Sequence, residues 1–135
     1  MDASVAVKWV MPEHGSENAD RLLGDGEPLL APDLVLVEAA NALWKKVTRR
    51  EVSVGEARRA LQMLRGSALE TRPTAPLLGR ALDLATQHKH PVYDCIYVAL
   101  AEAEGARLVS ADARLLTAGA RRLRWPVAVV DLATI

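Results

Sequence analysis

The sequence contains no phenylalanine, a single cysteine, Cys95, and no excess of either charge, with 17 basic and 17 acidic residues. A lone cysteine forms neither an intramolecular disulfide nor a cysteine-based zinc cage, which favours a protein of the reducing cytoplasm. A net charge of zero argues against a polybasic tail or membrane anchor. No uninterrupted apolar run approaches the ~18 residues of a membrane span, and the N-terminus lacks the layout of a signal peptide. We therefore expect a soluble, cytoplasmic protein.

What the sequence does have is a large apolar fraction, 50% of 135 residues. A chain of this length and composition builds a hydrophobic core without disulfides or metals to hold it together. It shows no linker rich in serine and glycine, no low-complexity run and no repeat of fixed period. We predict a single domain that comprises residues 1–135.

Proline and glycine residues separate helical segments from short apolar ones that are typical of strands. The patterns predict helices over residues 4–11, 16–23, 33–49, 53–64, 77–87, 91–104 and 112–118, and strands over residues 28–31, 69–73, 107–111 and 126–130. Strands that alternate with helices favour a parallel sheet covered on both faces, which is a three-layer α/β/α sandwich. Before Asp2, only Met1 is left for a first strand, although a strand usually takes ~5 residues.

Two carboxylates stand inside strongly apolar segments. Glu38 has only apolar neighbours between Leu34 and Ala40, and Asp94 is the only charged residue between Pro91 and Ala101. Charged side chains are rarely buried unless they are paired or bind a metal ion. Asp94 also falls in the first turn of its predicted helix, where the helix dipole favours a negative charge.

Two further carboxylates follow predicted strands. Asp112 comes just after the strand at residues 107–111, and Asp2 follows whatever exists of the first strand. Ligands of open α/β sheets bind outside the carboxyl ends of strands, so neighbouring strands, ~4.8 Å apart, would direct both carboxylates into one cleft. Taken singly, Asp2 fits an exposed terminal residue, Asp94 and Asp112 fit helix N-caps, and Glu38 fits an ion pair with Lys45. The four together favour a shared site.

Four carboxylates in one cleft repel one another unless a cation compensates their charge. A hard divalent ion that prefers oxygen ligands, Mg²⁺ or Mn²⁺, suits this role. Such a site is typical of phosphodiester hydrolysis, because the ion activates water and stabilises charge on phosphate oxygens. One ion or two, ~3.5–4 Å apart, are both compatible with the sequence.

Four segments of the chain resemble a known family. They are Asp2–Trp9, Glu38–Leu43, Tyr93–Ala101 and Ser110–Leu115, and in this order they are similar to PIN-domain ribonucleases of the VapC toxin type. The resemblance implies a parallel sheet of strand order 3-2-1-4-5 and Mg²⁺-dependent endoribonuclease activity. It also implies the toxin role in a type II toxin–antitoxin system, a cognate antitoxin as partner and a homodimer.

The resemblance also implies roles for individual residues. Asp2, Glu38, Asp94 and Asp112 match the family's acidic quartet, with Asp2 and Asp94 the expected direct metal ligands. Smaller polar residues that orient carboxylates or water match Ser4, Asn41 and Ser110. The chain departs from the family in the missing front of the first strand, and our hypothesis is that the natural chain starts upstream.

Basic residues gather in a few clusters despite the neutral total. Setting aside the four carboxylates leaves 13 acidic residues against 17 basic ones, so the remaining surface is basic. Candidates for contacts with RNA phosphates are Lys45, Arg49, Arg121 and Arg122.

Two other functions stay open at this point. One is phosphoryl transfer through an aspartyl phosphate, although no lysine follows the strand at residues 107–111 as that chemistry needs. The other is a catalytically inactive binding module in which the quartet holds a structural ion. We expect His88 and His90 in a solvent-exposed turn, Cys95 as a buried inert thiol, and Tyr97 in the core or an interface.

Overall fold

The computed structural model describes residues 1–24, 26–120 and 125–135. Its elements are α1 (Ala3–Val10), α2 (Ser16–Gly24), β1 (Leu30–Pro32), α3 (Leu34–Thr48), α4 (Val54–Arg65), β2 (Glu70–Arg72), η1 (Ala75–Leu77), α5 (Leu78–His88), α6 (Val92–Ala103), β3 (Leu108–Ser110), α7 (Ala113–Ala120), β4 (Val129–Asp131) and η2 (Leu132–Thr134). The predicted order of helices and strands is confirmed. The last strand begins three residues later than predicted, at Val129.

The strands are short and pair in parallel. β1 pairs with β2 so that Leu30 lies opposite Glu70, and β3 pairs with β4 so that Leu108 lies opposite Val129. The α/β class with parallel strands is therefore confirmed. Within the described ranges, however, the strands form two separate pairs and not one continuous five-stranded sheet.

Met1 and Asp2 lie between the two pairs of strands. The Met1 amino group donates to the Leu30 carbonyl oxygen at 2.7 Å, and the Asp2 amide donates to the Val109 carbonyl oxygen at 3.2 Å. From side to side the elements run β2, β1, Met1–Asp2, β3, β4. Two residues make only one hydrogen bond to each neighbour, which is why no central strand is formed. A single sheet of order 3-2-1-4-5 stays a prediction.

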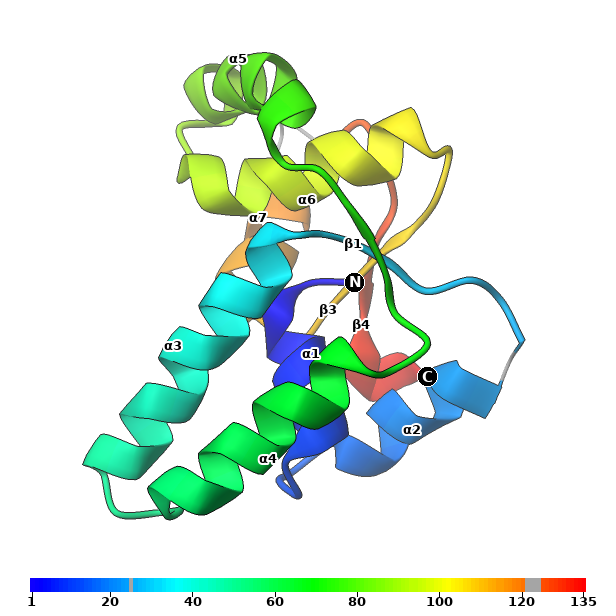
Figure 1. The fold of residues 1–135 in the computed structure, drawn as a ribbon. Helices are drawn as coiled ribbons and strands as arrows, with labels where there is room; N and C mark the ends of the chain where they lie inside the picture. The colour runs from blue at the N-terminus through cyan, green and yellow to red at the C-terminus, as the bar shows by residue number, and fades with distance from the viewer. Residues whose placement is uncertain (25, 121–124) are drawn as a thin grey trace.

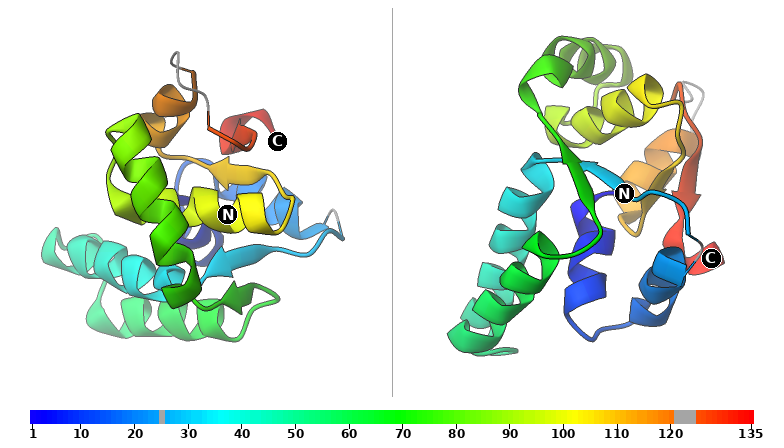
Figure 2. Two further views of the ribbon diagram at one scale, coloured as in Figure 1. Left: turned by 90° about the horizontal axis from the view of Figure 1, so that it is seen from above. Right: turned by 45° about the vertical axis from the view of Figure 1, so that its right-hand side comes forward.

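Helices cover the strands from two sides. In Figure 1, α5 and α6 lie above the strands, while α1, α3 and α4 lie below them. Seen from above in Figure 2, α6 runs alongside β3, and α5 packs across it. The centre of the core is α6, whose residues Cys95–Ala101 are all buried. No helix among the described residues is long and apolar enough to cross a membrane.

The helix α4 shows how a local signal sets a boundary. The Ser53 hydroxyl accepts a hydrogen bond from the Glu56 amide at 3.1 Å, and the Glu56 carboxylate accepts one from the Ser53 amide at 2.7 Å. This reciprocal capping box satisfies two amides that have no partner within the helix. The capping box thus sets the start of α4 at Val54, one residue after the predicted start.

Candidate active site

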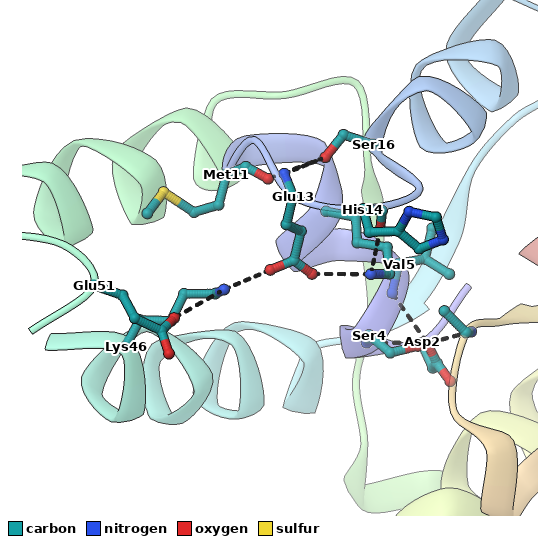
Figure 3. Close-up of polar contacts among 11 residues, drawn as sticks. Asp2, Ser4, Val5, Met11, Glu13, His14, Ser16, Lys46 and Glu51 are labelled. Atoms are coloured by element: carbon teal, nitrogen blue, oxygen red, sulfur yellow. Dashed lines mark hydrogen bonds and ion pairs between the residues drawn. The ribbon is translucent and has the colours of Figure 1, made fainter. Parts of the chain in front are cut away.

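Asp2 caps the N-terminus of α1 and is only 6% exposed. Its Oδ1 accepts hydrogen bonds from the Ser4 amide at 3.0 Å, the Ser4 hydroxyl at 2.5 Å and the Val5 amide at 3.2 Å; Figure 3 shows this end of α1. Its Oδ2 accepts a hydrogen bond from the Ser110 hydroxyl. Burial raises the pKa of Asp2, although these hydrogen bonds act in the opposite direction. The hydrogen-bond donors are neutral, and the nearby N-terminal ammonium group lowers the pKa without outweighing burial.

The two serine hydroxyls also tie α1 to the end of β3. Ser4 Oγ accepts a hydrogen bond from the Ala111 amide at 2.9 Å, and Ser110 Oγ accepts one from the Asp112 amide at 2.9 Å. Each hydroxyl therefore donates to Asp2 and accepts from the chain that follows β3. This arrangement fixes Asp2 at the carboxyl end of the strand, where the sequence predicted a cleft.

Glu38 comes from the second turn of α3 and reaches the buried helix α6. Its Oε2 accepts a hydrogen bond from the Tyr97 hydroxyl. Burial raises the pKa of Glu38, and the nearby carboxylates of Asp94 and Asp2 raise it further, against the lowering effect of Tyr97. The same environment raises the pKa of Tyr97, so the phenol keeps its proton and stays a donor. The partner of Glu38 is thus Tyr97, and the alternative of an ion pair with Lys45 is wrong.

Asp94 lies in the first turn of α6, as predicted, and contacts a histidine. His90 Nε2 lies 2.6 Å from Asp94 Oδ2, with the His90 side chain only 11% exposed. The His90 ring packs edge-on against Trp125 at a centroid distance of 5.4 Å, and His88 lies 4.3 Å from the same indole. The expectation of a solvent-exposed turn is therefore wrong for His90, because buried Trp125 provides an apolar wall.

Asp112 lies at the edge of this group. Its Oδ1 accepts a hydrogen bond from the Arg114 amide at 2.8 Å, and its Oδ2 lies 3.4 Å from an Arg114 guanidinium nitrogen. The Asp112 carboxylate is thus engaged within its own turn. The link to Asp2 is made by the Asp112 backbone amide, which donates to the Ser110 hydroxyl that in turn donates to Asp2. Of the other carboxylates in the quartet, those of Asp94 and Asp2 lie near enough to raise the pKa of Glu38.

The other residues predicted for the site do not all lie near the carboxylates. Ser4 and Ser110 contact Asp2, whereas Asn41 is exposed on α3. Arg121 and Arg122 lie outside the described residues. Sequence reasoning missed His90 and Tyr97, which contact Asp94 and Glu38. For Tyr97 the available signal was its position three residues after Asp94 on α6, whereas His90 precedes the first residue of α6 and had no such signal.

No group of three or more His, Cys, Asp or Glu side chains within residues 1–24, 26–120 and 125–135 is arranged to hold a metal ion. Hydroxyl and imidazole groups instead engage oxygens of the three inner carboxylates. The chemistry of the donors nevertheless fits a hard cation, since all are carboxylate oxygens in a partly buried setting. The pKa values of Asp2 and Glu38 are raised mainly by burial, and a bound cation would favour their charged forms.

A basic groove adjoins the carboxylates. It has a volume of about 350 Å³ and begins at Ser4 and Ala111, next to Asp2. Its cationic side chains are Lys8, Lys45, Lys46 and Arg49, with Glu13 as its acidic residue. Cations in a groove that leads to buried carboxylates suit a polyanion whose phosphate is brought to the acidic cluster.

Comparison with known proteins identifies the family. The family model of the PIN domain matches residues 1–120, and the chain belongs to the PIN domain family. The solved structure of PAE2754 from Pyrobaculum aerophilum is similar, with a TM-score of 0.74 and 27% sequence identity. That similarity covers 98% of this chain and 82% of the other.

More specific similarity is to VapC ribonucleases. Ribonuclease VapC3 of Pyrobaculum aerophilum is 38% identical over 117 residues, which are 85% of this chain and 89% of the relative. Ribonuclease VapC9 of Mycobacterium tuberculosis is 34% identical over 130 residues, 96% of each chain. The family that the four sequence segments indicated is thus confirmed, over most of the chain.

Proposed function

We propose that this protein is a Mg²⁺-dependent endoribonuclease and the toxin of a type II toxin–antitoxin system. The observation that carries the proposal is the convergence of Asp2, Glu38 and Asp94 from three different helices, with raised pKa values for Asp2 and Glu38. The named VapC relatives support ribonuclease chemistry over other uses of an acidic cluster. A carboxylate cluster that needs a cation, in a chain with such relatives, fits phosphodiester hydrolysis better than aspartyl phosphorylation.

Asp2, Glu38 and Asp94 would hold the metal ion, and Asp112 would complete the quartet from the edge of the cluster. Bound Mg²⁺, or Mn²⁺, supplies a more acidic water and stabilises the negative charge that develops on the phosphate oxygens. The residues fit because carboxylate oxygens are preferred ligands of both ions.

The polar residues around the cluster hold the carboxylates in place. Tyr97 engages one oxygen of Glu38 and His90 one oxygen of Asp94, and a carboxylate has further lone pairs for a ligand. Ser4 and Ser110 hold Asp2 between α1 and β3. Such supporting hydrogen bonds typically change metal affinity or activity by ~10–100-fold when they are removed.

RNA would lie along the basic groove, with phosphates near Lys45 and Arg49. Arg121 and Arg122 remain candidates from the sequence alone. In addition, a cognate antitoxin and a second copy of the chain are the proposed protein partners. Val37 and Trp44 support a protein interface, because both are exposed and lie seven residues apart on one face of α3.

The proposal is tested with purified protein and single-stranded RNA. We expect cleavage that requires Mg²⁺ and stops on addition of EDTA, and no cleavage by Asp94→Asn with the circular dichroism of the folded protein. Asp83→Asn is the matched control, because Asp83 is an exposed aspartate of α5. Full activity of Asp94→Asn would exclude the assignment, and EDTA-resistant cleavage would exclude the metal. A protein that binds Mg²⁺ without cleaving any RNA would be the binding module.

A further inference from the structure

A second cleft opens beside Asp94, between the first turns of α6 and α7. This α6–α7 pocket has a volume of about 410 Å³, within the ~300–1,000 Å³ typical of small-ligand sites. Asp94 and His90 line it from the α6 side, and Arg114 and Thr117 line it from α7. Because Asp94 belongs to the acidic cluster, a group bound here would lie next to the phosphate that water would attack at the cluster.

Arg114 gives the pocket a cationic side. Its guanidinium is exposed and touches Asp112 through one nitrogen at 3.4 Å. A guanidinium has five N–H donors, so this single contact leaves donors for a phosphate.

The remaining walls suit a flat, partly apolar group. Small apolar side chains, those of Pro91, Ala113 and Ala118, leave the pocket wide between the two helices. The His90 ring is held in one orientation by Asp94 at 2.6 Å and by Trp125 at 5.4 Å between ring centroids. A fixed ring gives a base a surface to pack on without an entropic cost for ordering it.

We propose that the α6–α7 pocket binds one nucleotide of the RNA next to the scissile phosphate, with its base against His90 and Thr117 and its phosphate on Arg114. This inference rests on the proposed ribonuclease function and adds a specificity site to it. The basic groove carries four cations and so favours phosphates of any sequence, whereas the α6–α7 pocket has an apolar floor and fixed polar groups. The base that enters the pocket is therefore the one that the protein selects.

The test is to fill the pocket and measure RNA binding without metal. Thr117→Trp places an indole in the cavity, and Thr86→Trp, at an exposed threonine of α5, is the matched control. With a mixed-sequence single-stranded RNA in EDTA, fluorescence anisotropy should show at least about fivefold weaker binding by Thr117→Trp, the loss expected when one base contact disappears. Arg114→Ala should weaken binding similarly, and Thr86→Trp should bind as the wild type does.

A second measurement addresses selection of the base. Sequencing of cleavage sites in Mg²⁺ should show that Thr117→Trp changes the nucleotide preference at one position beside the cut, while Thr117→Ser keeps it. Equal RNA binding by Thr117→Trp and wild type, with both folded, would overturn the pocket and leave the proposed function intact. A wild type that cleaves no RNA would overturn the proposed function itself, whatever its affinity for RNA.

Discussion

The helix α1 has a carboxylate near each end, and the two differ in burial and in the charge of the groups that contact them (Figure 3). At the N-terminal end, Asp2 is buried and is held by the hydroxyls of Ser4 and Ser110. Just beyond the C-terminal end, Glu13 lies 3.0 Å from Lys8 and 2.5 Å from Lys46. The hydrogen-bond donors to Asp2 are neutral, whereas Glu13 forms ion pairs with two lysine ammonium groups.

The pKa values of the two carboxylates differ in direction for this reason. Burial raises the pKa of Asp2 above its usual 3.8. Partial burial acts the same way on Glu13, but the ammonium groups of Lys46 and Lys8 outweigh it and lower the pKa. A carboxylate with compensated charge stabilises the fold, whereas one without compensation is available to a cation. The depth of burial and the charge of the partners therefore both distinguish the two carboxylates.

The largest expected effect is on cleavage by Asp2→Asn. Asparagine keeps the helix cap but loses the charge, so the fold should remain while RNA cleavage falls by at least ~100-fold. Initial cleavage rates and circular dichroism measure the two properties. Glu13→Gln, the same change at the other end of α1, should cleave at least as fast as the wild type, because it removes a negative charge from the basic groove. If both variants cleave equally well, the two ends of α1 do not differ as described.

The second effect is on the pH dependence of stability. Because the folded state raises the pKa of Asp2 and Glu38, it binds protons more tightly than the unfolded chain. Without a divalent ion, this contribution to stability is present below the usual values of 3.8 and 4.5 and is lost as pH rises through the raised values.

Mg²⁺ should then recover stability at neutral pH, by about 2.7 kcal/mol at a concentration 100 times its Kd. Thermal unfolding followed by circular dichroism, with and without Mg²⁺, measures the recovery. Asp2→Asn should reduce it, and Glu13→Gln should keep it. A midpoint of unfolding that does not respond to Mg²⁺ would show that the acidic cluster takes no cation.

A smaller effect is expected at the basic groove. Lys45→Ala should weaken RNA binding about threefold to tenfold at low salt and reduce the slope of log K against log salt by ~0.7. Lys45 lines the groove, whereas Arg65, at the end of α4, is an exposed cation that does not line it and serves as the control. Equal losses in Lys45→Ala and Arg65→Ala would indicate attraction by total charge and no defined path.

The smallest effect is on the stability of Glu13→Gln. Glu13 forms one ion pair with Lys8 of α1 and one with Lys46 of α3, so their loss should lower the free energy of unfolding by about 1 kcal/mol in urea titrations at low salt. Glu27→Gln is the comparison, because its contact with Arg107 is 3.4 Å long and largely exposed. If Glu27→Gln is the more destabilising change, compensation of charge is not what Glu13 contributes.

Much of the site was accessible from local patterns. Glu38 and Asp94 were recognisable because each interrupts an apolar helical segment, and α4 because its capping box is encoded by Ser53 and Glu56. The roles of Tyr97 and His90 were not, since both lie in stretches whose apolar neighbours predict core or turn. Tyr97 contacts Glu38 of another helix, and His90 is buried because Trp125 packs against it.

By itself the sequence determined the α/β class, the order of the elements and the four carboxylates, because helix caps, apolar periodicity and misplaced charges are properties of neighbouring residues. Only the tertiary structure decided how those carboxylates are held. It engages Asp2 with two hydroxyls and Glu13 with two ammonium groups, and it leaves Asp112 at the edge of the cluster with Arg114. Ser110 and Lys46 are distant in the chain from the carboxylates that they engage, and the pKa of a carboxylate depends on which partners folding brings near.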